Sequence, residues 1–298
     1  MQERIYFYNR IIQTCVVVFL IVTMMPTAVR SAESSLDNIL GTQGQAQEGI
    51  VVFRFPRTDI RVTIDGEMIP TALGFASWTA FRQMGVDSMI MGDLVLLEKE
   101  INPVISALAA VNIRITALHN HFIGNTPRIM YMHIDGMGKA EDLARGLRGA
   151  LEKTGTPFGP SRPAGLVTPL TINTNRIEEI MGYAGQTGGG VFKITVGRSG
   201  VKMNGVEVTS SMGLNSWVGF VGSSERAHVA GDIAMTAKEV NPVIRILRNG
   251  GINVVAVHNH MLDEEPRIFF LHYWGTGPAE KLAQTLGEAF TIVKTPAK

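Results

Sequence analysis

The chain reads ALHNHFIGNTPRIMYMHID over residues 117–135 and AVHNHMLDEEPRIFFLHYW over residues 256–274. Each stretch holds a His-Asn-His triplet, then Pro-Arg-Ile and a third histidine, and the second stretch follows the first at an offset of 139 residues. Matches at this offset extend from about residue 53 to residue 150 without a gap, and they pair Trp78 with Trp217, Gly92-Asp93 with Gly231-Asp232, and Asn102-Pro103-Val104-Ile105 with Asn241-Pro242-Val243-Ile244. Self-similarity of this length indicates a duplicated structural unit.

The length and composition fit two copies of ordinary domain size. The 298 residues are 45% apolar, which is enough to fill two separate cores. We expect a first repeat at residues 33–151 and a second at 170–298, joined by a linker at 152–169 that is rich in proline and glycine. Leu40-Gly41 corresponds to Met181-Gly182 when two residues are inserted, which predicts a short helix at the start of each copy.

Within one copy, the sequence predicts strands, a helix, a β-hairpin and a second helix, in that order. The predicted strands are residues 51–55, 60–64, 67–69, 75–81 and 88–97. Asn102 is suited to cap a helix that begins at Pro103, and residues 140–151 have helical periodicity. Residues 113–122 and 128–135 flank a short loop, as in a hairpin. The predicted fold class is α+β: two tandem copies of an antiparallel sheet with helices packed on one face, related by a pseudo-twofold axis.

The first 32 residues have the pattern of a signal peptide. Arg4 and Arg10 give a basic start, residues 11–25 are apolar, and residues 26–32 end in small side chains. We expect cleavage, a periplasmic or secreted location, and no stable membrane span afterwards, because the apolar run is shorter than the roughly 20 residues that cross a bilayer. Cys15 is the only cysteine and would be removed, so any metal site in the mature chain must use His, Asp or Glu.

The charge balance excludes one class of partner. The 27 basic and 26 acidic residues nearly cancel, and no run of like charge occurs, so the sequence offers no electrostatic footprint for nucleic acid. The expected partners are therefore a small ligand or a metal ion. The sequence does not specify an oligomeric state.

The histidines form the strongest candidate site. His119 and His121 are two residues apart on a predicted strand, so they point to the same face of the sheet. A hairpin that is symmetric about Asn125 places His119 opposite Tyr131 and brings His133 to the same face, diagonal to His119 at about 7–8 Å. The corresponding set in the second copy is His258, His260 and His272. Neutral imidazoles at such spacing suit zinc, copper or iron, and the alternative is that they form ordinary buried hydrogen bonds. His228 has no counterpart in the first copy and is expected to be a surface or loop residue.

Acids and arginines supply further candidates for ligand binding. Glu100 and Glu239 precede the predicted helix caps, where the helix dipole favours a carboxylate without any catalytic role. Asp93 and Asp232 are further candidate carboxylates, and Asp93 follows a glycine, as a turn residue does. Arg128 and Arg267 each follow a proline and can bind a carboxylate or phosphate through two hydrogen bonds, the alternative being a surface salt bridge.

Four motifs together resemble the LppY/LpqO family, which is named after mycobacterial lipoproteins. They are Gly92-Asp93-Leu94-Val95-Leu96, Glu100-Ile101-Asn102-Pro103-Val104, Ala117-Leu118-His119-Asn120-His121 and Pro127-Arg128-Ile129-Met130-Tyr131-Met132-His133. The resemblance runs through both copies and implies an exported envelope protein without an assigned activity or catalytic residues. This sequence lacks a lipidation cysteine at the family's usual place, which favours a soluble periplasmic form.

Three hypotheses of function follow. The first is a binding protein that holds a metal ion or a small anionic ligand through the duplicated His-Asn-His hairpins. The second is a metal-assisted hydrolase or lyase in which Glu100 or Glu239 acts as general base on a bound water. The third is an interaction module in which Trp78 and Trp217 meet at the interface between the copies.

Overall fold

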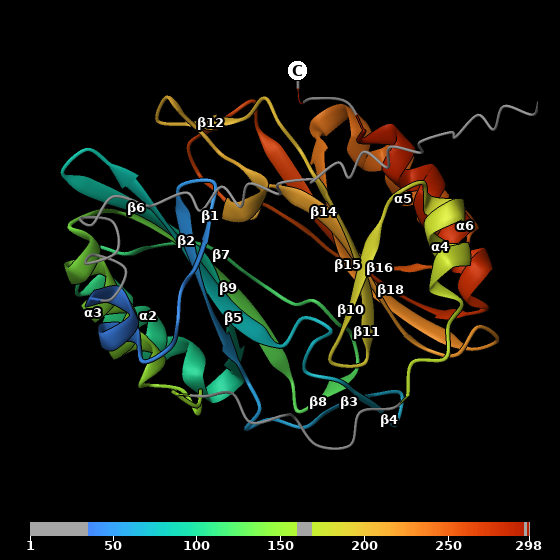
Figure 1. The fold of residues 1–298 in the computed structure, drawn as a ribbon, viewed down its shortest axis with the longest axis horizontal. Helices are drawn as coiled ribbons and strands as arrows, with labels where there is room; N and C mark the ends of the chain where they lie inside the picture. The colour runs from blue at the N-terminus through green and yellow to red at the C-terminus, as the bar shows by residue number, and fades with distance from the viewer. Residues whose placement is uncertain (1–34, 160–168, 295–296, 298) are drawn as a thin grey trace, which may run out of the picture.

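A computed structural model describes residues 35–159, 169–294 and 297. Its two copies pack with their sheets face to face in the centre and their helices on the outside (Figure 1). The order of layers is therefore helix, sheet, sheet, helix. The predicted signal peptide and residues 160–168 of the predicted linker lie outside the described residues. In the described part of the chain, no helix is long and apolar enough to cross a membrane.

Each copy is built on a six-stranded antiparallel sheet with the same strand order. In the first copy the order is β1 (Gln45–Gln47), β2 (Ile50–Pro56), β5 (Ala76–Met84), β6 (Asp87–Leu97), β9 (Ile129–Gly138) and β7 (Arg114–His119). In the second copy it is β10 (Gly185–Gly188), β11 (Val191–Gly197), β14 (Asn215–Gly222), β15 (Ala227–Thr236), β18 (Ile268–Gly277) and β16 (Asn253–His258). The predicted duplicated α+β fold is confirmed.

A small three-stranded sheet accompanies each large one. The first consists of β4 (Glu67–Ile69), β3 (Val62–Ile64) and β8 (Asn125–Thr126), and the second of β13 (Val206–Glu207), β12 (Lys202–Met203) and β17 (Glu264–Glu265). The loop of the predicted hairpin thus pairs with β3, through Thr63 and Thr126. This pairing ends β7 at His119, so His121 lies beyond the strand rather than on it as predicted. The predicted register of His119 opposite Tyr131 is confirmed.

Helices cover the outer face of each large sheet. The first copy has residues 35–40, α2 (Ile101–Ala109) and α3 (Ala140–Leu151), and the second has α4 (Thr174–Met181), α5 (Ala237–Asn249) and α6 (Ala279–Ile292). In the first copy, Leu147 of α3 packs with Phe53 and Met132 of the sheet, and an equivalent apolar cluster fills the second copy. The helices are therefore on one face, as predicted.

The first long helix of each copy starts earlier than its Asn-Pro pair suggested. In the second copy α5 begins at Ala237, and a carboxylate oxygen of Glu239 accepts a hydrogen bond from the Thr236 amide at 2.7 Å. In the first copy a 3-10 turn at Glu98–Glu100 leads into α2, and Glu100 accepts from the Leu97 amide at 2.8 Å. The prediction of Asn102 as the helix cap is wrong, because the glutamates satisfy the free backbone amides upstream of it.

The ungapped alignment of the repeats fails in the first long strand. Val51 pairs with Phe81, whereas Phe192 pairs with Phe220, which is the counterpart of Phe81. Phe192 is therefore equivalent to Val51, at an offset of 141 residues, and not to Phe53. The second copy has two residues fewer between its first long strand and the following hairpin. Sequence identity at Phe53 and Phe192 concealed this shift.

The inner faces of the two sheets form a shared apolar interface. One cluster of buried residues contains Met91 of the first copy and Phe270 of the second, and another contains Tyr131 and Trp274. This packing joins the copies through side chains of strands and loops, with the helices remaining outside.

The tryptophans of the interface are placed reciprocally. A methyl group at Gly213 would lie 2.8 Å from the Trp78 ring, and one at Gly74 would lie 3.7 Å from the Trp217 ring. Gly74 and Gly213 are repeat equivalents, as are the two tryptophans. Each tryptophan therefore lies against a glycine of the other copy, which is the pattern of a pseudo-twofold interface.

His228 also lies at the interface, which corrects its prediction as a surface or loop residue. It is in β15 with 7% of its surface exposed. Its Nε2 is 2.6 Å from a carboxylate oxygen of Glu67, and its Nδ1 is 2.9 Å from the Thr276 hydroxyl. Arg226 binds the other oxygen of Glu67 at 2.6 Å, so one glutamate of the first copy holds two side chains of the second.

Replacing Gly231 with alanine is expected to destabilise the fold. The Tyr273 hydroxyl donates to the Trp217 carbonyl at 3.0 Å, and a methyl group on Gly231 would collide with both atoms. Overpacking of this kind costs about 1–3 kcal/mol. We expect a lower midpoint of urea unfolding for Gly231→Ala. The control is Gly277→Ala on the neighbouring strand, where an added methyl meets no atom within 4 Å. Equal midpoints for the two variants would contradict the strand packing described.

Candidate metal centre

Six histidines gather between the two sheets. His119 ends β7, His121 follows it, and His133 lies on β9, while His258, His260 and His272 hold the same places in the second copy. On β9, His133 and Tyr131 face the other copy because the side chains between them, such as Met132, face the helices. Five of the six are buried, and His258 is half-buried.

The histidines interleave about the pseudo-twofold axis. The rings of His119 and His258, which are repeat equivalents, stack with their centroids 3.7 Å apart. The ring centroids of His121 and His272 are 3.6 Å apart, and those of the equivalent pair, His133 and His260, are 3.7 Å apart. Each copy therefore contributes to one common cluster rather than forming a separate site on its own hairpin.

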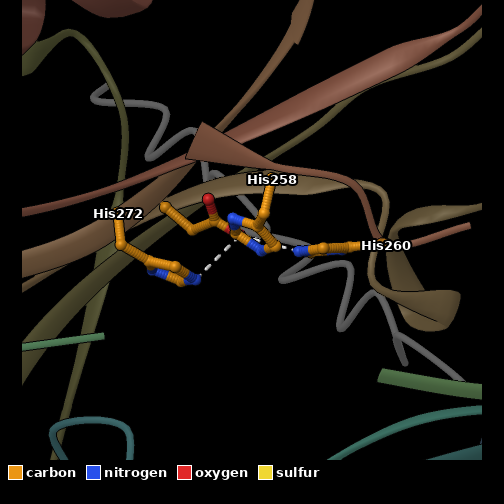
Figure 2. Close-up of side chains that lie close together, drawn as sticks. His258, His260 and His272 are labelled. Carbon is orange, nitrogen blue, oxygen red and sulfur yellow. Dashed lines mark ion pairs between the residues drawn. The ribbon is translucent and has the colours of Figure 1, made fainter. Parts of the chain in front are cut away.

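Three groups of side chains in this cluster place their ligand atoms within 4.8 Å of one another. The groups are Asp232 with His258, His260 and His272; His119 with His121 and His272; and His119 with His133 and His258. Figure 2 shows the three histidines of the second copy, with dashed lines for the ion pairs to the Asp232 carboxylate. Two of the three groups combine residues from both copies.

The closest ring nitrogens have the spacing of metal ligands. His119 Nε2 lies 3.2 Å from His272 Nε2 and 3.1 Å from His121 Nε2. Two nitrogens bound to one tetrahedral zinc ion at about 2.0–2.1 Å lie about 3.3 Å apart. The observed separations are close to this edge length, so a small shift of the side chains is enough to admit an ion.

Hydrogen bonding alone does not satisfy these three nitrogens. His272 Nδ1 donates to the Gly231 carbonyl at 3.0 Å, which leaves the lone pair of neutral His272 on Nε2, facing the cluster. Metal-binding histidines are held by this kind of bond from the distal nitrogen. His119 Nε2 can make one straight hydrogen bond, so one of its two close contacts lacks a well-aligned proton. A cation between the nitrogens would remove this conflict.

Unpaired polar atoms are concentrated in the same cluster. Buried polar atoms in proteins nearly always have a partner, so a concentration of exceptions indicates a ligand or an ion. In the described part of the chain, the buried side-chain atoms that lack a hydrogen bond include Asp93 Oδ1, Asp232 Oδ1, His119 Nδ1, His121 Nδ1, His133 Nε2, His258 Nδ1 and Nε2, His260 Nε2 and Tyr131 Oη. His260 Nε2 is 3.2 Å from Asp232 Oδ2, but without the geometry of a hydrogen bond.

Two aspartates complete the cluster. Asp93 lies within β6 and Asp232 within β15, so the alternative that Asp93 is a turn residue is wrong. Asp93 pairs in register with His133, and Asp232 pairs with His272. Asp93 Oδ2 is 3.7 Å from His121 Nε2. The signal for their role was the repeated Gly-Asp pair inside a predicted strand, where a carboxylate is unusual unless it has a partner.

Burial favours the uncharged forms of the side chains in this cluster. Desolvation lowers the pKa of all six histidines, to about 3 for His258 and about 4 for His272. Burial raises the pKa of the Asp93 carboxyl well above its usual value, and the nearby Asp232 raises it further. The pKa of Asp232 is also raised by burial, although His272 acts in the opposite direction. The neutral imidazole is the form that binds a metal.

The two glutamates of the predicted site serve the fold. The oxygens of Glu100 bind both terminal nitrogens of Arg57 at 2.8 and 3.0 Å, and the amides of Leu97 and Gly155. Glu239 binds Arg198 with both of its oxygens, at 3.0 and 2.9 Å. Neither carboxylate belongs to the histidine groups found among the described residues.

The two arginines of the predicted site lie on the surface. Arg128 is 3.6 Å from Glu98, and both side chains are largely exposed. Arg267, whose side chain is half exposed, is 3.2 Å from the buried carboxylate of Glu264, three residues earlier in the same hairpin. An exposed pair such as Arg128 and Glu98 contributes little to stability. Binding of a ligand by Arg128, Arg267, Glu100 or Glu239 stays a prediction.

Residues 34–153 and 175–292 each match the family model described as Domain of Unknown Function (DUF1259). The chain belongs to this family. The two matches cover most of the chain and correspond to the two copies, so the DUF1259 unit is one sheet with its helices. No curated protein matches the chain.

The crystal structure of EtuB from Clostridium kluyveri is similar over 85% of this chain and 97% of that chain, at 9% identity and a TM-score of 0.19. A TM-score of this size does not indicate a shared fold.

Metal-free protein is expected to lose stability as the pH falls from about 6.5 towards 4. Because the folded state lowers the pKa of His272 to about 4, the unfolded state binds its proton first over this range. Stability is fully present above the unfolded pKa and falls by about 1.4 kcal/mol per pH unit for this histidine. Urea unfolding at several pH values, with a chelator present, measures the slope.

The control for this slope is the variant His272→Phe, which should reduce the dependence on pH. Asp93 and Asp232 act in the opposite direction, because their raised pKa values let the folded state keep protons that the unfolded state has released. Two carboxyls oppose six histidines, so the slope of the histidines dominates between pH 4 and 6.5. Constant stability over this range would contradict the buried, neutral cluster.

Proposed function

We propose that this DUF1259 protein is an exported protein of the cell envelope that binds one transition-metal ion between its two copies, using histidines from both. The observation that carries the proposal is the contact of three ring nitrogens, from His119, His121 and His272, at 3.1–3.2 Å in a buried interface. The signal-like start of the chain and its resemblance to the LppY/LpqO family support export, to the periplasm or outside the cell.

The donor set favours zinc, copper or iron. Calcium and magnesium prefer oxygen ligands, whereas imidazole nitrogen suits zinc and the later transition metals. Asp93 or Asp232 would supply a carboxylate to complete the coordination. The carbonyl of Gly231 orients His272 from the outside, as the outer partners of metal ligands do.

The overlap of the ligand groups indicates a single ion. Any two of the three groups share a histidine, which is His119, His258 or His272. A neutral imidazole has one lone pair in its plane and serves one ion. Two separate sites, one on each hairpin, would have to divide a cluster in which the ligands of the two copies alternate.

The binding function is better supported than the hydrolase or lyase alternative. That alternative assigned the general base to Glu100 or Glu239, but both oxygens of each carboxylate already bind arginine or backbone amides. A general base needs an oxygen within hydrogen-bond reach of the bound water. The contacts of these glutamates favour a structural role.

Elemental analysis after loading and dialysis is expected to find one zinc, copper or iron ion per chain. We expect His119→Ala and His272→Ala, which each remove one of the three close ring nitrogens, to weaken binding by more than about 100-fold. Loss of a residue that only orients a ligand weakens binding by about 10–100-fold. Zinc should also raise the melting temperature of the wild type, because it binds the folded state alone.

The matched control is His228→Ala, which removes the seventh histidine, outside the cluster, and should leave the metal content unchanged. Circular dichroism checks that each variant is folded. Two ions per chain would refute the shared site. Absence of bound metal under all loading conditions would refute metal binding altogether.

A further inference from the structure

A cavity of about 560 Å³ lies between the sheets, next to the histidine cluster. His121, His133 and Asp93, with their counterparts His260, His272 and Asp232, form part of its lining. The volume is within the range of pockets that bind small organic molecules, roughly 300–1,000 Å³. The cavity therefore offers space for a ligand beside the candidate metal centre.

Trp78 and Trp217 supply the large apolar surfaces of the cavity. They are repeat equivalents, and each packs against a glycine of the opposite copy, Gly213 or Gly74, which also lines the cavity. Because these glycines have no side chains, the tryptophan rings can lie against them and the cavity stays open. The apolar part of a ligand would find aromatic surface from both copies.

Two cationic side chains also line the cavity, Arg54 on β2 and Lys193 on β11. The Lys193 ammonium lies 4.2 Å from the centre of the Trp217 ring. The Arg54 guanidinium donates to the neutral Gln45 side chain at 3.2 Å. Among the described residues neither cation forms an ion pair with a carboxylate, and both side chains keep exposed surface, so both are available to a ligand in the cavity.

These charges break the symmetry of the two copies. By strand register, Lys193 opposite Gly219 corresponds to Val52 opposite Ala80. Thr195, opposite Trp217, corresponds to Arg54, opposite Trp78. Packing of the sheets therefore does not require a cation at either place, since the other copy has an uncharged residue there. Neither cation belongs to the pattern that the two copies share, and together they add two positive charges to the cavity.

We propose that this cavity binds a small organic anion, a carboxylate or a phosphate ester, with its negative group between Arg54 and Lys193 and its apolar part against Trp78 and Trp217. The proposal goes beyond metal binding and applies to the metal-free protein as well. Charge-assisted hydrogen bonds from the two cations supply the affinity for the anion, and the aromatic surfaces exclude water around it.

The electrostatics of Lys193 agree with this role. The side chain keeps exposed surface, and its ammonium lies over the Trp217 ring in the lining of the cavity. Burial lowers the pKa of Lys193 to about 8, Arg54 lowers it further, and Asp232 acts in the opposite direction. A bound anion would offset the repulsion between the two cations and stabilise the charged lysine.

Binding of three probes of similar size tests the proposal: benzoate, phenyl phosphate and the neutral amide benzamide. Tryptophan fluorescence and calorimetry measure their Kd with metal-free and metal-loaded protein. We expect at least one anion to bind more tightly than benzamide in both forms, and the better anion distinguishes a carboxylate ligand from a phosphate ligand. Affinity for the anion should fall as the pH rises above about 8, where Lys193 loses its proton.

The repeat supplies the test variants. Lys193→Val and Arg54→Thr introduce the residues that the other copy has at the same places, so the fold should tolerate them. We expect each to weaken anion binding by about tenfold or more, with benzamide unaffected, and Lys193→Val to abolish the pH dependence above 8. Lys202→Val, at an exposed residue of β12 that does not line the cavity, is the control.

Equal affinity for benzamide and both anions, unchanged binding in the two variants, or no binding of either anion would overturn the proposal. Its failure is distinct from failure of the metal proposal. Loss of metal by His119→Ala, with anion binding retained, affects the metal centre alone. Loss of anion binding by Lys193→Val, with one metal ion still bound, affects the cavity alone.

Discussion

Each sheet has one face that its own helices cover and a second face that only the other copy can cover. Burial of this second face, sheet against sheet, is the constraint on which the rest of the structure depends. It removes Tyr131, Trp274 and Phe270 from water, a large apolar gain of about 25 cal/mol for each Å² buried. It also places histidines and aspartates where water no longer satisfies them, which is costly for polar groups without partners. The interface thus combines stabilisation by apolar packing with the cost of buried polar groups that lack partners.

The pseudo-twofold relation makes each of these contributions occur twice. A histidine of one copy meets a different histidine of the other, and the equivalent pair repeats the contact at nearly the same separation, 3.6 and 3.7 Å. Each aspartate lies beside rings of its own copy, Asp93 near His121 and Asp232 near His260 and His272. An ion that binds here would be held by strands from each copy, so it would act as a cross-link of the interface as well as a bound cargo. Metal binding and cohesion of the copies would then be one property.

The sequence predicted the fold class and the repeat, and it singled out the six histidines that the structure groups together. Periodicity and internal identity are signals that can be read from the sequence alone. His119 opposite Tyr131 followed from hairpin symmetry alone. The sequence did not predict where the histidines of one copy lie relative to those of the other. One sequence could not reveal that the two sets of histidines interleave, since that depends on how two inner faces pack.

Other differences arose where tertiary contacts override local patterns. His121 leaves the strand because the following loop pairs with β3. The helix starts before Asn102 because Glu100 binds the amide of Leu97, and the same carboxylate is taken up by Arg57, a residue far away in sequence. Asp93 resembled a turn residue only in its neighbour Gly92. That glycine in fact allows the close approach of the Trp78 carbonyl, which a methyl group would meet at 2.6 Å.

Arg54 and Lys193 have a meaning that emerges from the covalent connection of the copies. Two identical chains on an exact twofold axis would carry every substitution twice, and their shared cavity would look the same from either side. A ligand could then enter in two equivalent orientations. In a single chain one half can change alone, and here Val52 and Thr195 keep uncharged side chains where their counterparts are cationic. The cavity of the duplicated chain is therefore asymmetric, and its two ends can distinguish the two ends of an asymmetric ligand.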